Sequence, residues 1–339
     1  MSSQSNYFSL KHFQIIFKIG EGQFGNVYRV KDNESDEFYA AKICKFMVNE
    51  ETQENPETLS LFREVNLMSL LNHPSIIRLI GYCQDNFDGD PCPTVITEFA
   101  SNGSLQTILN KERKGLSPSE WNDTKKLIAI YGIASGMSYL HAHNIIHRDL
   151  KPDNILMDDF LHPKISDFGL SKMFDFLSVS MNVQSQAGLK GTPLYMAPEV
   201  FDEKYSAASD VYAFSMIVYE VFNGELPLSS MTNINQIIKK VLFEGYRPDI
   251  AEDICPAYRE LIESCWSPNP EDRPSFESIV HKMREGGEFI TSTMDEAEFF
   301  DYVDFIDNSV ISFEKTNKMF GFDEFVKTHG RHKIVRRVN

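Results

Sequence analysis

The chain has 339 residues, of which 42% are hydrophobic, and it carries a formal net charge of −16. This length and apolar content predict globular domains with a proper core rather than disorder. The negative charge argues against a nucleic-acid partner, because phosphate backbones are bound by cationic surfaces. The sequence shows no secretory signal and no apolar run of the roughly 20 residues that a membrane span needs, so we expect a soluble, cytoplasmic protein.

The first hundred residues are predicted to form mainly β-strands separated by polar turns. The expected strands cover residues 13–19, 26–30, 37–43, 75–82 and 94–99. One helix interrupts them at residues 58–71. The residues Leu61, Glu64, Val65, Met68 and Leu71 recur there at 3- and 4-residue steps and share one helical face.

A glycine-rich stretch, IGEGQFGNV, lies between the first two predicted strands. Its Gly20, Gly22 and Gly25 form a GxGxxG pattern that Rossmann folds also use, but there a helix follows the glycines. Here strand, turn and strand follow, which favours a hairpin whose backbone N–H groups approach phosphate oxygens. On the next strand the two-residue period puts Ala40 and Lys42 on one face, so a small residue can touch a base while the ammonium reaches the phosphates.

From about Ser101 the pattern becomes helical. Helices are expected at residues 104–112, 121–143, 210–224, 234–243 and 256–266. The fold class predicted is therefore α+β, with a small β-rich lobe joined to a larger helical one. The five cysteines show neither CxxC pairing nor metal-ligand spacing, so we expect reduced thiols rather than disulfides or a zinc site.

Residues 145–154, IIHRDLKPDN, form a dense polar cluster beside an apolar run. Such groups cost free energy unless each has a partner or a task. Two β-like runs follow, joined by a turn, and an antiparallel hairpin there would place Asn154 and Asp167 at the same end. A single Asp or Asn near a turn is usually a turn or cap residue. The pair, however, offers the hard oxygen donors that suit Mg²⁺.

Three ordered motifs, HRDLKPDN at 147–154, DFG at 167–169 and APE at 197–199, resemble the signature set of the protein kinases. The resemblance covers roughly residues 13–284. It implies a two-lobed protein kinase fold that binds ATP between its lobes.

The implied domain boundaries follow from this resemblance. The N-lobe would cover 13–100 and the C-lobe 101–284, after an N-terminal tail of residues 1–12. A C-terminal tail, 285–339, is acidic and aromatic and ends in a basic segment. It is interpreted as a regulatory or docking element, as a mobile extension, or as a helix packed on the large lobe.

The resemblance also implies roles for single residues. Asp149 would accept the proton of the substrate hydroxyl, and Lys151 would neutralise charge on the transferring phosphoryl group. Lys42 and Glu64 would form the ion pair that positions the α and β phosphates, while Asn154 and Asp167 would hold Mg²⁺. The residues implied to contact ATP, besides Lys42, are Ile19, Gly20, Glu21, Gly22, Gly25, Val27, Ala40, Thr97, Glu98, Ala100 and Leu156.

Within the family, a Lys in DLKPxN and the Gly-Thr before PLYMAPE accompany serine/threonine specificity, and TEFASNGSL resembles the tyrosine-kinase-like group. The expected activity is transfer of the γ-phosphate of Mg-ATP to Ser or Thr hydroxyls of protein substrates in intracellular signalling. Two alternatives stay open: a pseudokinase-type scaffold that binds partners, and a tyrosine or dual-specificity kinase. The presence of all the catalytic residues named above argues against the scaffold.

Other residues are implied to be architectural. Glu199 would pair with Arg273, Asp210 would hold the backbone of the catalytic loop, and His147 would pack under Phe168.

Arg148 lies under the activation segment in the family, where its guanidinium would receive a phosphate. Thr192 is expected to contact the catalytic loop. This leaves Ser185, and next Ser180, as the site that an upstream activator or autophosphorylation would modify. The alternative is a segment already ordered by packing.

Overall fold

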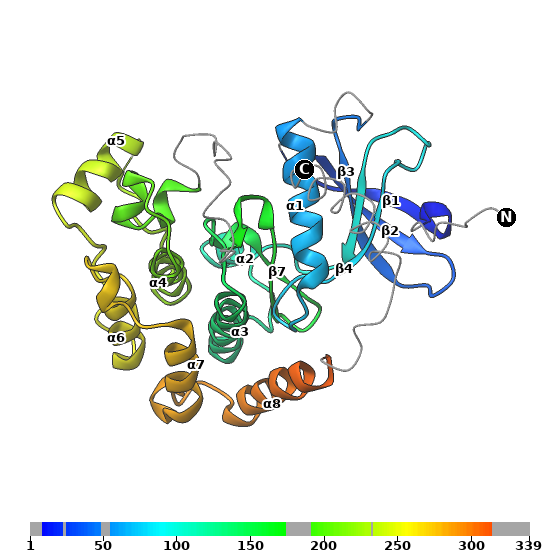
Figure 1. The fold of residues 1–339 in the computed structure, drawn as a ribbon. Helices are drawn as coiled ribbons and strands as arrows, with labels where there is room; N and C mark the ends of the chain where they lie inside the picture. Colours follow the sequence, from blue (N-terminus) through cyan, green and yellow to red (C-terminus); the bar gives the residue numbers. More distant parts are fainter. Residues whose placement is uncertain (1–8, 23–24, 49–54, 174–190, 232, 314–339) are drawn as a thin grey trace. The chain divides into compact units, whose positions relative to one another are not determined.

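The structure is a computed structural model that describes residues 9–22, 25–48, 55–173, 191–231 and 233–313. Within the described residues the chain divides into two compact units (Figure 1). Unit 1 comprises residues up to 72, residues 77–100 and the end of the last helix from residue 309. Unit 2 comprises residues 73–76 and 101–308.

Unit 1 is built on one antiparallel sheet of five strands in the order β1-β2-β3-β5-β4. The strands are β1 (Phe13–Glu21), β2 (Gly25–Asp32), β3 (Phe38–Cys44), β4 (Leu79–Cys83) and β5 (Thr94–Glu98). Glycine is required at the start of β2, because a Cβ atom on Gly25 would lie 2.5 Å from the carbonyl oxygen of Ile43 on β3. The third glycine of the GxGxxG pattern therefore serves close strand pairing.

Helix α1 (Pro56–Leu70) packs on this sheet through the face that the sequence predicts. Leu61 and Val65 are buried in a cluster with Cys44 of β3, Tyr82 of β4 and Val95 of β5. Proline at the first helical position suits the start of α1, since its missing N–H would have no partner within the helix.

Unit 2 is mainly helical. Its helices are α2 (Leu105–Glu112), α3 (Asp123–Ala142), α4 (Ala207–Asn223), α5 (Ile234–Ile237), α6 (Pro256–Cys265), α7 (Phe276–Glu285) and α8 (Glu296–Phe313). Helices α3 and α4 are buried nearly all round, as expected of helices at the centre of a core. The predicted helix at 234–243 is present, but from Ile238 to Phe243 it continues as a wider π-helix.

Short strand pairs complete unit 2. Strand β7 (Ile155–Met157) pairs antiparallel with β8 (Pro163–Ile165), and β6 (Ile145–Ile146) pairs with β9 (Lys172–Met173). These elements confirm the α+β class, with a β-rich first unit and a helical second unit.

The strand predicted over residues 75–82 is wrong in its first four residues, because β4 begins only at Leu79. The segment His73–Ile76 belongs to unit 2 instead. The backbone N–H of Ile165 donates to the carbonyl oxygen of Ser75 (2.8 Å), and Ile76 bridges Ile165 in parallel orientation. The end of the predicted strand thus forms β4, whereas its beginning, at Ser75 and Ile76, contacts β8.

Part of the predicted C-terminal tail is folded. Helix α8 buries Phe299, Tyr302, Val303 and Ile306, and the preceding Phe289 is also buried. The boundaries at residues 12, 100 and 284 stay predictions. No helix in the described part of the chain is long and apolar enough to cross a membrane.

Candidate active site

Lys42 and Glu64 form an ion pair within unit 1. The Lys42 Nζ atom lies 3.1 Å from Glu64 Oε1 and 3.3 Å from Oε2. The Glu64 side chain is only 13% exposed, so the lysine ammonium supplies the charge that a partly buried carboxylate requires. The apolar stripe of α1, packed on β3, β4 and β5, aims the carboxylate at the β3 lysine.

The residues predicted to contact ATP in unit 1 lie on neighbouring strands. Val27 of β2 stands opposite Gly20 of β1 and Lys42 of β3, while Ala40 of β3 stands opposite Thr97 of β5. Ile19, near the end of β1, is exposed. The sheet thus brings these side chains together from four strands.

The glycine hairpin is described on both sides of residues 23–24. Gly22 donates its N–H to the carbonyl oxygen of Gly25 at 2.8 Å. Glu21 accepts hydrogen bonds from Lys18 (2.6 Å) and Lys45 (2.5 Å), which lower the pKa of its carboxyl group to about 2. Glu21 is therefore engaged by two lysines at the base of the hairpin.

The end of β5 has one donor already in use. The N–H of Glu98 donates to the carbonyl oxygen of Arg78 (3.0 Å), and the Glu98 carboxylate accepts from the N–H of Arg78 (2.8 Å). A ligand could therefore not take the Glu98 N–H without breaking a bond within unit 1. Ala100 ends unit 1, and Leu156 lies on β7 in unit 2.

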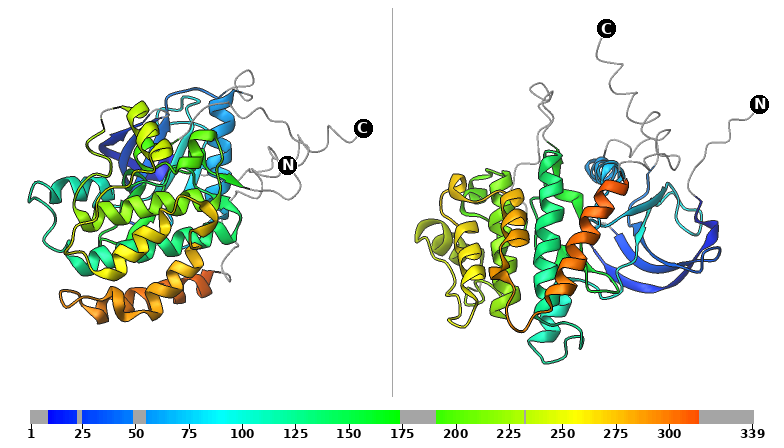
Figure 2. Two further views of the ribbon diagram at one scale, coloured as in Figure 1. Left: turned by 90° about the vertical axis from the view of Figure 1, so that its left-hand side faces the viewer. Right: turned by 90° about the horizontal axis from the view of Figure 1, so that it is seen from below.

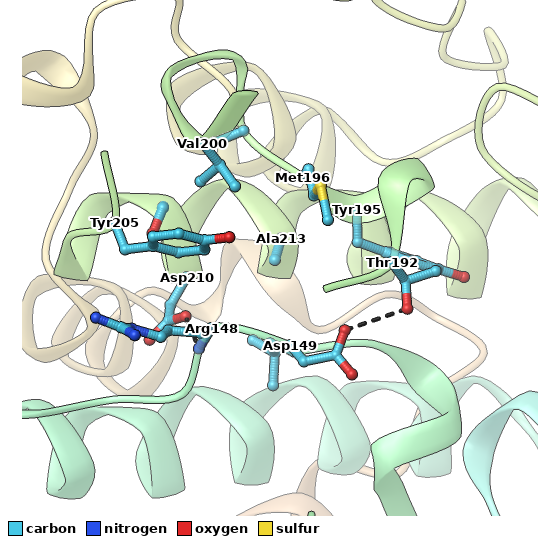
Figure 3. Close-up of a pocket in the computed structure, with 12 residues that line it drawn as sticks. Arg148, Asp149, Thr192, Tyr195, Met196, Val200, Tyr205, Asp210 and Ala213 are labelled. Atoms are coloured by element: carbon cyan, nitrogen blue, oxygen red, sulfur yellow. Dashed lines mark hydrogen bonds between the residues drawn. The ribbon is translucent and has the colours of Figure 1, made fainter. Parts of the chain in front are cut away.

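In unit 2, Asp149 is the centre of a hydrogen-bonded cluster. Thr192 donates its hydroxyl to Asp149 Oδ1 (3.1 Å), as Figure 3 shows, and Lys151 Nζ lies 2.8 Å from Oδ2. The side-chain amide of Asn154 donates to Oδ2 (3.1 Å) and to the Asp149 carbonyl oxygen (2.8 Å). Lys151 also donates to the Thr192 hydroxyl at 2.7 Å.

Asn154 and Asp167 lie at the same end of the β7–β8 hairpin, as the sequence predicts. Ile155 pairs with Ile165 at this end of the hairpin. Asn154 directly precedes Ile155, and Asp167 follows Ile165 by two positions. Ser166 donates to the Asn154 carbonyl oxygen from both its N–H (2.8 Å) and its hydroxyl (2.9 Å). Asp167 is exposed and has a left-handed φ of 61°.

The two residues fit a magnesium ion by the chemistry of their donors. The Asn154 amide nitrogen is used by Asp149, which leaves the amide oxygen as its donor to a cation. The Asp167 carboxylate accepts only a long bond, 3.4 Å, from the N–H of Gly169. Both are hard oxygen atoms of the kind that Mg²⁺ prefers. Within the described ranges, no group of three or more His, Cys, Asp or Glu residues is arranged so that it could hold a metal ion.

Asp210 holds the backbone that leads into Asp149. Its carboxylate accepts the N–H groups of His147 (2.8 Å) and Arg148 (2.9 Å), and it lies 3.0 Å from His141 Nε2. His147 packs against Phe168 with ring centroids 5.5 Å apart, so the predicted contact between these two residues is confirmed. His141 was not among the predicted residues, because its position on α3 belongs to no recognisable motif.

A second buried carboxylate was also missed. Glu220 of α4 is fully buried, accepts hydrogen bonds from Tyr195 (2.6 Å) and Gln106 (2.8 Å), and pairs with Arg113. The sequence did contain a sign of this site, because Glu220 lies among the apolar residues of α4 and a buried carboxylate requires partners.

Arg148 lines a small cavity with Tyr205 and Thr192 (Figure 3). Its guanidinium lies 4.9 Å from the centre of the Tyr205 ring. Burial lowers the pKa of this guanidinium, and its Nε atom is buried without an acceptor among the described residues. Ser180 and Ser185 lie outside the described residues.

Glu199 and Arg273 form the predicted pair. Two guanidinium nitrogens donate to the two carboxylate oxygens at 2.6 and 2.9 Å, and Arg273 also donates to the carbonyl oxygens of Ser267 and Ala208. The arginine side chain is fully buried and the glutamate side chain is 14% exposed.

Comparison with known proteins places most of the chain in one family. A sequence profile described as protein tyrosine and serine/threonine kinase matches residues 13–283. The chain is 35% identical over 279 residues to the serine/threonine-protein kinase CTR1 of Arabidopsis thaliana, covering 79% of this chain and 31% of that protein. It is 34% identical over 296 residues to the human receptor-interacting serine/threonine-protein kinase 3, covering 82% and 52%.

A third relative is described as having a different specificity. The dual specificity protein kinase shkA of Dictyostelium discoideum is 33% identical over 272 residues, covering 79% of this chain and 48% of that protein. The chain thus matches about a third to a half of the length of these curated relatives.

The buried pair yields a stability prediction. Glu199→Ala should lower the free energy of unfolding by about 3–5 kcal/mol, because it leaves the buried Arg273 guanidinium without its counter-charge. Urea unfolding of both proteins measures the difference. Glu260→Ala, which removes an exposed partner of Lys282, is the matched control and should leave the midpoint nearly unchanged. Equal midpoints for Glu199→Ala and wild type would contradict the prediction.

Proposed function

Because this chain belongs to the protein tyrosine and serine/threonine kinase family, we propose that it transfers the γ-phosphate of ATP to Ser or Thr hydroxyls of protein substrates. The observation that carries the proposal is the set of contacts around Asp149. Lys151, Asn154 and Thr192 all contact the Asp149 carboxylate, and these contacts hold its two oxygen atoms in a defined orientation. An acceptor positioned in this way is what general base catalysis requires.

Each residue of the cluster has a distinct role in the proposal. Asp149 accepts the proton of the attacking hydroxyl and orients its oxygen toward the γ phosphorus. Lys151 stabilises negative charge on the transferring phosphoryl group with its ammonium. Thr192 holds both residues through its hydroxyl, since it accepts from Lys151 and donates to Asp149.

The proposal also assigns the groups that position the nucleotide. Lys42, held by Glu64, donates to the α and β phosphates, and the glycine hairpin offers backbone N–H groups. Asn154 and Asp167 would hold magnesium, which when bound neutralises charge on the phosphates.

The preference for Ser or Thr rests on Lys151 and Thr192, together with the fact that two of the relatives are named serine/threonine-protein kinases. A tyrosine or dual-specificity kinase is the second candidate, because the relative shkA carries that description. The non-catalytic alternative is a scaffold that binds partners without transferring phosphate. The intact Lys42–Glu64 ion pair argues against this alternative. A cytoplasmic location and a role in signalling stay proposals.

The catalytic base is tested by Asp149→Asn. This change keeps the size of the side chain and removes its basicity, so kcat should fall by about 10²- to 10⁴-fold while nucleotide still binds. Transfer of labelled γ-phosphate to a generic protein substrate measures it, and phosphoamino-acid analysis of the product should give phosphoserine and phosphothreonine. Asp153→Asn, at an exposed neighbouring position, is the control and should keep wild-type turnover. Wild-type turnover in Asp149→Asn would refute the assignment.

A second prediction concerns phosphate positioning by Lys42. Lys42→Met should lower kcat/KM by about 10²-fold or more, since the ammonium is lost, but it should not unfold a strand position that tolerates an apolar side chain. Glu64→Gln should show a weaker form of the same defect. Lys31→Met, on the neighbouring strand and paired with Asp36, controls for loss of a lysine from the sheet. A melting temperature that collapses in Lys42→Met would instead make the lysine structural.

A third prediction concerns activation through Arg148. A phosphate on Ser185 or Ser180 would supply the acceptor that the buried Arg148 Nε atom lacks, so phosphatase treatment should lower activity by about tenfold or more. Mass spectrometry identifies the phosphorylated residue, and Ser185→Ala and Ser180→Ala are then made singly and together. Ser119→Ala, on an exposed loop, is the control. Full activity in the double variant, with no response to phosphatase, would rule out the switch.

A further inference from the structure

Helix α8 lies beyond residue 283, where the match to the family profile ends, yet it is part of the core of unit 2. Phe299, Tyr302 and Ile306 are buried at 3- and 4-residue spacing, whereas Asp301 and Asp304 are exposed. Figure 2 shows α8 running beside α3. The helix is thus an amphipathic addition whose apolar face has a partner within the chain.

Several contacts fix α8 on α3. Lys125 of α3 pairs with Glu298 at 2.6 Å, and the N–H of Asp295 donates to the Thr124 hydroxyl at 2.8 Å. The Phe299 ring meets the α3 residue Tyr131 edge to face, with centroids 5.4 Å apart. These contacts set both the position and the rotation of α8, and they direct Tyr302 inward.

Tyr302 is a buried residue of α8, only 3% exposed, and both its hydroxyl and its ring contact residues outside the helix. Its hydroxyl lies 3.1 Å from the Ser75 hydroxyl, and its ring centroid is 4.4 Å from that of His162 in the β7–β8 turn. A Cβ atom at position 132 of α3 would lie 2.4 Å from the Tyr302 hydroxyl and 2.5 Å from Pro163 Cγ. Gly132 therefore lets Tyr302 and the hairpin approach α3 at the same point.

The two contacts of Tyr302 lead to the residues that would hold magnesium. The carbonyl oxygen of Ser75 accepts a hydrogen bond from the N–H of Ile165 (2.8 Å). Ser166, which follows Ile165 in the chain, donates both its N–H and its hydroxyl to the Asn154 carbonyl oxygen. Asp167 follows directly. At the other end of the hairpin, the N–H of His162 donates to the Asp158 carboxylate at 2.8 Å. Tyr302 thus braces the hairpin at its turn and beside its open end.

We infer that Tyr302 of α8 is a positioning residue for Asn154 and Asp167, acting through Ser75 and the β7–β8 hairpin. The inference rests on the proposed function, because the magnesium-binding role of Asn154 and Asp167 belongs to it. A helix outside the matched part of the chain then sets how well the two oxygen donors are placed for the cation. The opposing interpretation is that α8 only adds buried area to unit 2.

Tyr302→Phe in the full-length chain separates the two interpretations, because it removes the hydroxyl and keeps the ring. Amide hydrogen exchange at Ile165 and Ser166 should become about 3- to 10-fold faster, since the hydrogen bond that orders Ser75 is lost. The free Mg²⁺ concentration that gives half-maximal phosphotransfer at saturating ATP should rise about 3- to 10-fold, with kcat at saturating Mg²⁺ within about twofold of wild type. A general loss of stability would not produce this selective change.

Tyr258→Phe is the matched control. Tyr258 is equally buried in unit 2 and donates its hydroxyl to the Phe289 carbonyl oxygen at 2.8 Å, away from the hairpin. Its loss should lower the melting temperature comparably and leave both the exchange at Ile165 and Ser166 and the Mg²⁺ dependence at wild-type values.

Ser75→Ala removes the other hydroxyl of the same contact and should reproduce the Tyr302→Phe result, including where Tyr302→Phe folds poorly. The double variant should change no more than either single one, because both remove one interaction. Unchanged exchange in Tyr302→Phe and Ser75→Ala, or equal changes in Tyr258→Phe, would overturn the inference. Absence of phosphotransfer in the wild type would refute the proposed function, and the exchange comparison would still decide whether Tyr302 braces the hairpin.

Discussion

The buried carboxylate of Asp210 is the constraint on which the candidate active site depends. Arg148 has a left-handed φ of 71°, a conformation that costs a non-glycine residue about 1–3 kcal/mol. Asp210 accepts the N–H groups of both His147 and Arg148, and hydrogen bonds to a charged group contribute about 1.5–3 kcal/mol each. The two bonds therefore outweigh the strain. They hold the chain in the turn that brings Asp149 toward Thr192.

Other charges in unit 2 follow the same principle, in which a buried ion is retained because its partners are supplied from distant parts of the chain. Arg273 binds Glu199 and two carbonyl oxygens, and Glu220 binds Arg113, Gln106 and Tyr195. Such groups add little net stability over apolar residues, but losing one partner is costly. They tie the segment from Thr192 to Glu199 to α2, α4 and the chain before α7, which fixes the residues that contact Asp149.

The β7–β8 hairpin connects this charged centre with the far side of unit 2. One end carries Asn154 and continues into Asp167, and its turn packs against α8 through His162. The hairpin and its neighbours pack closely against Gly132 and Gly136 of α3. A Cβ atom at either position would lie less than 3 Å from one of their side-chain atoms. This packing is the physical basis of the inferred effect of α8 on Asn154 and Asp167.

Much of this protein was determined by local sequence. The strands of unit 1, the face of α1 and the β7–β8 hairpin follow from periodicity and turn residues, which act over a few positions. The HRDLKPDN, DFG and APE motifs likewise indicated the family and the residues that gather around Asp149. What sequence could not supply were contacts between segments far apart in the chain. The switch of His73–Ile76 to β8, the partners of Glu220, the role of His141 and the docking of α8 through Tyr302 arise only when distant surfaces meet, because burial and hydrogen-bond partners are properties of the packed chain and not of any one stretch.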